Sequence, residues 1–137
     1  MTEGNAAGVL HQGPVPVVVH GVFEYAAGIL LIVAPFLFGF QANSAKAASV
    51  VLGLVLLAFT AMSALPTGLV RSISLGVHVT VDIVLALLLV ALPFLLGFTD
   101  EAAPTALFIA LGVVHLLNTI ATRFPQSPRR GHPETAA

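Results

Sequence analysis

Four long apolar stretches dominate the pattern of hydrophobic and polar positions along the chain. They cover residues 17–38, 45–65, 73–96 and 103–122, and each holds at most one charged residue. A helix needs about 20 apolar residues to cross a hydrocarbon core of about 30 Å. None of the four stretches leaves a polar face for water, as a surface helix of a soluble protein does. The pattern therefore predicts an all-α membrane protein with four transmembrane helices.

Glycine, proline and polar residues separate the apolar stretches. Gly39 and Gly97 follow the first and third stretches and predict helix ends, because glycine readily adopts the left-handed conformation of a helix cap. Pro66 and Gly68 end the second stretch. We therefore predict two two-helix repeats, at residues 17–65 and 73–122, joined by a cytoplasmic linker at 66–72. A disordered N-terminal lead (1–16) precedes them, and a disordered cytoplasmic tail (123–137) follows.

The two halves of the chain repeat each other. His78 stands 58 positions after His20, and Asp82 stands 58 positions after Glu24. In the second helix of each half the offset becomes 59, which pairs Gly53 with Gly112 and Thr60 with Thr119. Two spans return the chain to its starting side, so both units insert in the same direction. The sequence thus predicts tandem hairpins with a pseudo-two-fold axis along the membrane normal.

A Pro-Phe-x-x-Gly-Phe motif closes the first helix of each half. Its members are Pro35, Phe36, Gly39 and Phe40 in the first copy, and Pro93, Phe94, Gly97 and Phe98 in the second. Proline in a last turn removes a backbone donor and bends the helix. We expect the rings at the outer membrane interface, where aromatic side chains anchor a helix at its depth. The functional alternative is a lipid or quinone contact between the two phenylalanine pairs.

This motif, together with the His-x-x-x-acid pair ahead of it, resembles the SPW-repeat family of small bacterial membrane proteins. That family carries a Ser-Pro-Trp motif in the first helix of each two-helix unit, often followed by Leu-Gly-Phe. Ala34 and Leu92 stand here in place of the serine, and Phe36 and Phe94 in place of the tryptophan. The resemblance, over about residues 17–123, implies a two-helix repeat fold in the bacterial inner membrane and adds little about function.

Composition and charge narrow the classes of partner. Apolar residues make up 58% of the chain and charged residues 8%, against about a quarter charged in a soluble domain. A net charge of −1 gives no reason to expect nucleic acid, and the absence of cysteine excludes disulfides, thiolate metal sites and cysteine nucleophiles. Basic residues favour the cytoplasmic side. One side of the membrane is expected to hold four basic residues, Arg71, Arg123, Arg129 and Arg130. The other side holds one, Lys46, together with Asp100 and Glu101. We therefore predict that both termini are cytoplasmic.

Five histidine and acidic residues fall inside the predicted spans: His20, Glu24, His78, Asp82 and His115. Such groups are costly in a bilayer and call for a partner or a role. A histidine and an acid four residues apart share one helix face. Glycine, serine and threonine on the second and fourth helices allow close approach and hydrogen bonding. We therefore expect the five residues at a similar depth in one bundle interior.

Three interpretations of this polar set stay open. The histidine–acid pairs can hold the helix bundle together, since polar contacts between spans are common. They can form a proton or ion path, because histidine exchanges protons near neutral pH. They can also ligate a metal or haem, although no HExxH or c-type haem motif supports that interpretation.

No catalytic motif stands out in the sequence, which lacks a G-x-S-x-G run, a P-loop and a dinucleotide fingerprint. We therefore predict a structural or accessory protein of the cytoplasmic membrane without enzymatic activity, metal or cofactor. Its expected partners are the lipid bilayer and either further copies of the chain or the subunits of a membrane complex.

Overall fold

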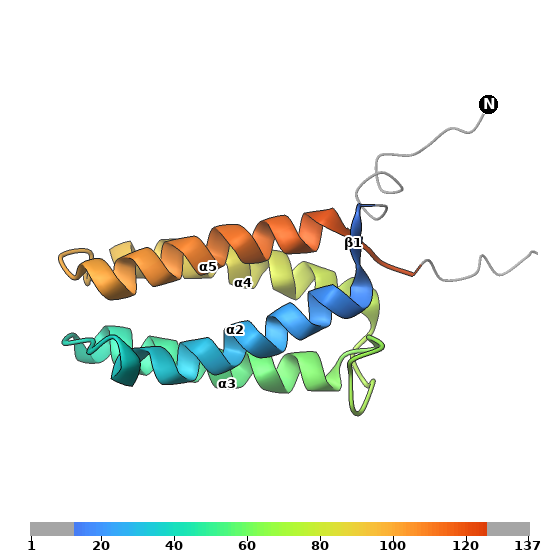
Figure 1. The fold of residues 1–137 in the computed structure, drawn as a ribbon, viewed down its shortest axis with the longest axis horizontal. Helices are drawn as coiled ribbons and strands as arrows, with labels where there is room; N and C mark the ends of the chain where they lie inside the picture. Colours follow the sequence, from blue (N-terminus) through green and yellow to red (C-terminus); the bar gives the residue numbers. More distant parts are fainter. Residues whose placement is uncertain (1–12, 126–137) are drawn as a thin grey trace, which may run out of the picture.

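A computed structural model describes residues 13–125, which form four helices and two very short strands (Figure 1). In chain order the elements are β1 Val15–Pro16, α2 Val17–Leu37, α3 Asn43–Met62, α4 Leu75–Leu95, α5 Ala102–Ala121 and β2 Thr122–Arg123. Residues 1–12 and 126–137 lie outside the described part, and with them most of the predicted lead and tail. Val15 and Pro16, which fall in the predicted lead, form β1.

All four helices are long and apolar enough to cross a membrane. Large apolar side chains are exposed on each of them, as the surface of a helix in lipid requires; examples are Val22, Val51, Val84 and Leu117. Helix contacts are dense within two hairpins, α2 with α3 and α4 with α5, and sparse between them. The chain is thus a multi-pass membrane protein built from two tandem two-helix repeats, which confirms the predicted fold class.

The helices differ from the predicted spans mainly at their ends. The second span was expected over 45–65, but α3 runs from Asn43 to Met62 because Ser63 leaves the helix and bridges to Ile73. The third was expected from residue 73, but α4 starts at Leu75, where the Ser74 hydroxyl accepts a hydrogen bond from Val77 N at 3.4 Å.

Small residues set the spacing inside each hairpin in the same way. A Cβ added to Gly53 of α3 would lie 2.6 Å from Gly28 O, and one added to Gly112 of α5 would lie 2.7 Å from Ala86 O. Ala86 follows Gly28 by the offset of the first helices, and Gly112 follows Gly53 by that of the second. The repeat is therefore one packing unit used twice.

The two repeats also close on each other at one end of the bundle. Val15 pairs with Thr122 across β1 and β2, and Ser63 pairs with Ile73 in an isolated bridge. The repeat offsets carry Val15 onto Ile73 and Ser63 onto Thr122, so the two pairings are equivalent. Figure 1 shows β1 at the right, which we call the terminal end, and the two hairpin turns at the left, which we call the turn end.

The prediction for the motif phenylalanines is half wrong. Phe36 and Phe94 are 81% and 65% exposed, but Phe40 and Phe98 are only 2% exposed and belong to the core. Gly39 adopts φ 62°, a left-handed conformation that turns the chain back so that Phe40 N donates to Pro35 O at 3.0 Å. Gly97 does the same for the second copy. The second ring of each motif therefore caps the apolar core instead of anchoring in lipid.

Candidate functional site: a buried histidine–acid cluster

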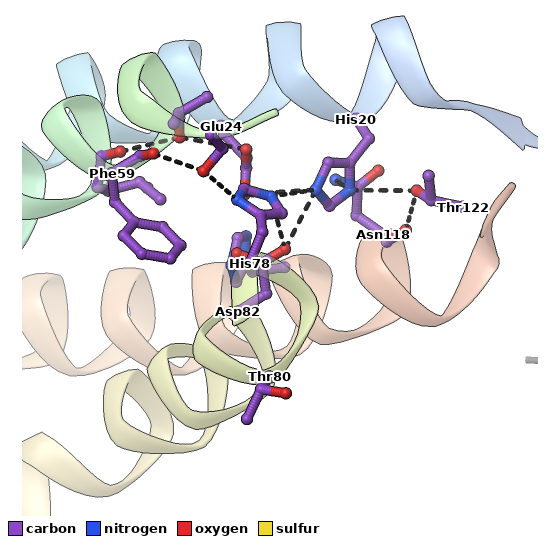
Figure 2. Close-up of polar contacts among 12 residues, drawn as sticks. His20, Glu24, Phe59, His78, Thr80, Asp82, Asn118 and Thr122 are labelled. Carbon is purple, nitrogen blue, oxygen red and sulfur yellow. Dashed lines mark hydrogen bonds and ion pairs between the residues drawn. The ribbon is translucent and has the colours of Figure 1, made fainter. Parts of the chain in front are cut away.

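The five histidine and acidic residues of the spans meet in the terminal half of the bundle (Figure 2). His20 and Glu24 come from α2, His78 and Asp82 from α4, and His115 from α5. Each is at most 1% exposed. We call them the His–acid cluster. The Pro-Phe-x-x-Gly-Phe residues lie at the turn end and take no part in it.

Equivalent positions on parallel helices explain why the cluster forms. His20 is the fourth residue of α2 and His78 the fourth of α4, and the acid follows one turn later in both helices. Each acid therefore lies about 10 Å along its helix. Because α2 and α4 run in the same direction, the two histidine–acid pairs reach the same depth and face each other.

Each histidine contacts the acids of both hairpins. His20 Nε2 lies 3.4 Å from Glu24 Oε1 and 3.2 Å from Asp82 Oδ2. His78 Nε2 lies 3.4 Å from Glu24 Oε1 and 3.1 Å from Asp82 Oδ2. The two Nε2 atoms are themselves 3.4 Å apart. Two nitrogens and two carboxylate oxygens thus surround one point, to which each hairpin contributes one of each.

Hydroxyl groups of the opposite hairpin contact the Nδ1 atoms of His20 and His78. Ser63 Oγ lies 2.7 Å from His78 Nδ1, and Thr122 Oγ1 lies 3.1 Å from His20 Nδ1. Asn118 Nδ2 lies 2.9 Å from the same His20 nitrogen. Sequence reasoning missed Thr122, although the offset that pairs it with Ser63 places a hydroxyl residue in both repeats.

Comparison with protein families identifies the repeat. The SPW repeat domain matches residues 18–122, which span all four helices. The chain belongs to the SPW repeat family. No curated protein and no solved structure matches it.

The SPW repeat protein is asymmetric at the centre of its cluster. The Thr60 hydroxyl lies 3.1 Å from Glu24 Oε2 and 2.8 Å from Leu56 O, and its one proton serves both acceptors, but the equivalent Thr119 Oγ1 has no hydrogen-bond partner among the described residues. His115 replaces the Leu56 of the first repeat. Its Nε2 lies 3.7 Å from Asp82 Oδ1, beyond hydrogen-bond distance. The acid of the second repeat therefore carries the less satisfied carboxylate.

Aromatic rings enclose the three imidazoles. Phe59 stacks on His78 with ring centroids 5.3 Å apart and planes 7° from parallel. Phe124 meets His20 edge-on at 5.1 Å, and Phe23 stacks on His115 at 6.2 Å. These rings exclude lipid and restrict rotation of the imidazoles, so the nitrogen atoms keep fixed directions.

Buried polar groups become scarce toward the turn end. Ser49 is the one buried polar side chain of residues 13–125 outside the terminal half, and it donates to Leu31 O at 2.5 Å. The core at the turn end is apolar: Leu31, Ala34, Phe40, Ala45, Leu89, Phe98 and Phe108. Among the described residues, the buried polar side chains other than Ser49 thus lie in the terminal half of the bundle.

Proposed function

We propose that this SPW repeat protein is an accessory membrane protein without catalytic activity of its own, and that the His–acid cluster joins its two hairpins. One observation carries the proposal: two of the three imidazoles contact a carboxylate of the other hairpin, His20 with Asp82 and His78 with Glu24. The hairpins touch each other sparsely elsewhere. Besides the cluster, the β1–β2 pairing, the Ser63–Ile73 bridge and the contacts of Gln41 N and Ala42 N with the Glu101 carboxylate join them, but the cluster supplies the buried side-chain ion pairs between the hairpins.

In a bilayer, such contacts between the hairpins favour one arrangement of the two repeats over others. A charged or polar group that lost its partner would face hydrocarbon, where no water can replace the lost contact. Removing one member of a buried ion pair costs about 3–5 kcal/mol in soluble proteins, because the other member stays buried and unpaired. Sliding or rotating one hairpin against the other would break several such contacts together. The cluster thus favours one register of the two repeats.

The test is the stability of the purified chain in detergent. His78→Ala removes one imidazole from both Glu24 and Asp82, and we expect it to lower the free energy of unfolding by about 3 kcal/mol. Adding Asp82→Leu should restore part of that loss by removing the unpaired acid. Thr80→Ala is the matched control, since Thr80 is exposed on the same helix and points away from the cluster (Figure 2). An unchanged stability of His78→Ala would contradict the proposal.

A proton or ion path is the second candidate, and the hydroxyl contacts of His20 and His78 at the terminal end favour it. The core at the turn end is apolar, which argues against a continuous proton or ion path through one chain. Proton flux into liposomes that is present in the wild type and lost in a Glu24→Gln, Asp82→Asn double variant would favour the path over our proposal.

We propose the cytoplasmic membrane as the location, with the terminal end inside. Arg71 and Arg123 lie at the terminal end, and Lys46, Asp100 and Glu101 lie at the turn end. Arg129 and Arg130 fall outside the described residues. The exposed apolar helix faces support a lipid surround, and an accessory role brings in further copies of the chain or the subunits of a complex as partners.

A further inference from the structure

We propose that His20, Glu24, His78 and Asp82 bind one divalent first-row transition metal ion, with zinc the best match. Each of the four side chains offers one ligand atom, and these atoms lie within 4.8 Å of one another. All four are fully buried. The sequence pattern predicts no metal, because the four ligands come from two separate hairpins and form no contiguous motif.

The spacing of the donor atoms fits a tetrahedral ion. Zinc binds imidazole nitrogen and carboxylate oxygen at about 2.0–2.1 Å, which places neighbouring ligand atoms of a tetrahedron about 3.3 Å apart. The five nitrogen–nitrogen and nitrogen–oxygen separations in the cluster run from 3.1 to 3.4 Å. Charge-assisted hydrogen bonds between these groups are normally about 2.7–2.9 Å long. The separations of 3.1 and 3.2 Å also allow a hydrogen bond, but all five match the edges of a tetrahedron, and the four ligand atoms as a set lie within 4.8 Å of one another. The cluster is therefore spaced so that all four groups can share one central ion.

The serine contact sets the tautomer of His78. Ser63 Oγ donates its single proton to Phe59 O at 2.6 Å. It can therefore only accept from His78 Nδ1, 2.7 Å away, and that nitrogen carries the proton. The Nε2 atom of the neutral ring then points its lone pair at the centre of the cluster. Metal-binding histidines have this arrangement, in which the outer N–H is held by a hydrogen-bond acceptor.

The threonine contact does the same for His20. Thr122 Oγ1 donates its proton to Asn118 O at 2.5 Å and offers a lone pair to His20 Nδ1 at 3.1 Å. Asn118 lies beside the same atom with its amide nitrogen, a donor, at 2.9 Å; a half-turn of the amide group, which puts its oxygen there, gives Nδ1 a second acceptor. Both imidazoles thus turn Nε2 inward, with the acceptor for Nδ1 supplied by the other hairpin.

Charge balance completes the argument. With both Nδ1 atoms protonated, two nitrogen lone pairs and two carboxylates face one another, and no group of residues 13–125 donates a hydrogen bond to Glu24 Oε1 or to either Asp82 oxygen. Buried anions without a counter-charge are strongly unfavourable. Two added protons or one divalent cation would neutralise the site. Metal binding should therefore displace two protons.

The ligand chemistry selects among ions. Two imidazoles with two carboxylates suit zinc and its first-row neighbours, whereas magnesium and calcium prefer oxygen ligands alone. The chain has no cysteine that would favour a softer ion. His115 is a positioning residue in this scheme, because its Nε2 faces Asp82 Oδ1 rather than the central atoms.

The experiment uses the full chain in detergent, stripped with a chelator and titrated with Zn²⁺ and with Co²⁺. We expect one ion per chain and the strong visible absorption of tetrahedral Co²⁺. Zinc affinity should fall on acidification, because protons compete with the ion for the imidazole and carboxylate ligands. These readouts need no variant and therefore do not depend on whether a variant folds.

Variants then locate the ion. Glu24→Gln with Asp82→Asn should abolish stoichiometric binding, whereas Ser63→Ala keeps every ligand and should weaken zinc about 10- to 100-fold. Thr80→Ala, on the exposed face of the helix that carries Asp82, should bind as the wild type does. A His11→Ala, His132→Ala double variant tests the two histidines outside the described residues. Absence of saturable binding, a weakly absorbing octahedral Co²⁺ spectrum, retention of the ion in the acid double variant, or loss of the ion with His11 and His132 would each overturn the proposal.

Discussion

At the scale of single residues, the two repeats differ where they meet. Glu24 corresponds to Asp82, Leu56 to His115 and Phe59 to Asn118. The two repeats of the SPW repeat protein thus share the buried histidines His20 and His78 but differ in the residues around them. His115 is the one cluster residue without a counterpart, and neither of its ring nitrogens has a hydrogen-bond partner in the described chain.

This asymmetry makes His115→Leu informative. The variant copies the first repeat, where Leu56 fills the equivalent position. Replacing an unpaired buried polar group by an apolar one is close to neutral or stabilising. We expect a change of less than about 1 kcal/mol in the free energy of unfolding, or an increase. A loss as large as that of His78→Ala would instead place His115 among the essential contacts of the cluster.

The sequence predicted the members of the cluster better than their neighbours. Ionisable residues in apolar spans are conspicuous, and a spacing of four fixes their common face. The contacts of Ser63 and Thr122 with the histidines could not be predicted from the sequence. Both residues lie just after the end of a helix, and the backbone pairing between the two repeats brings them to His78 and His20. The burial of Phe40 and Phe98 was missed because it depends on the chain reversal at Gly39 and Gly97.

At the scale of elements, each hairpin depends on close backbone contact. Gly53 and Gly112 lie where their helices approach a partner backbone, whereas a Cβ at Gly76 would meet nothing within 4 Å. The sequence predicted that the helices approach closely at small residues, because small residues are enriched where helices pack in membranes. The repeat offsets then identified which residues are equivalent.

Substitution at these glycines should separate packing from helix propensity. Gly53→Val and Gly112→Val force the helices apart, and we expect each to lower the free energy of unfolding by more than about 2 kcal/mol. Gly76→Ala should leave stability unchanged or raise it by up to about 1 kcal/mol, since alanine is the better helix former. Thermal or denaturant unfolding in detergent would measure all three. Equal effects at the three sites would contradict the packing account.

At the scale of the whole molecule, two like-directed hairpins place the cluster, both strands and two arginines at one end. The other end carries the two turns and the buried motif phenylalanines. This polarity follows from the tandem repeat alone, because each repeat returns the chain to its starting side. Which end faces the cytoplasm rests on the distribution of basic residues.

Single cysteines can determine that orientation, because the chain has none of its own. Asp100 and Ser72 are exposed at the turn end and the terminal end respectively. We expect an impermeant thiol reagent to label Asp100→Cys in intact cells, and Ser72→Cys only after permeabilisation. The reverse pattern would show that the terminal end lies outside.

The most direct measurement of the central claim is a double-mutant cycle between Glu24 and His78, which belong to different hairpins. Glu24→Gln, His78→Gln and the double variant would be compared with the wild type by reversible unfolding in mixed micelles. We predict a coupling of at least about 1 kcal/mol, against additivity for the control pair of Glu24→Gln with Thr80→Ala. A coupling of zero between Glu24 and His78 would show that the cluster does not join the two repeats.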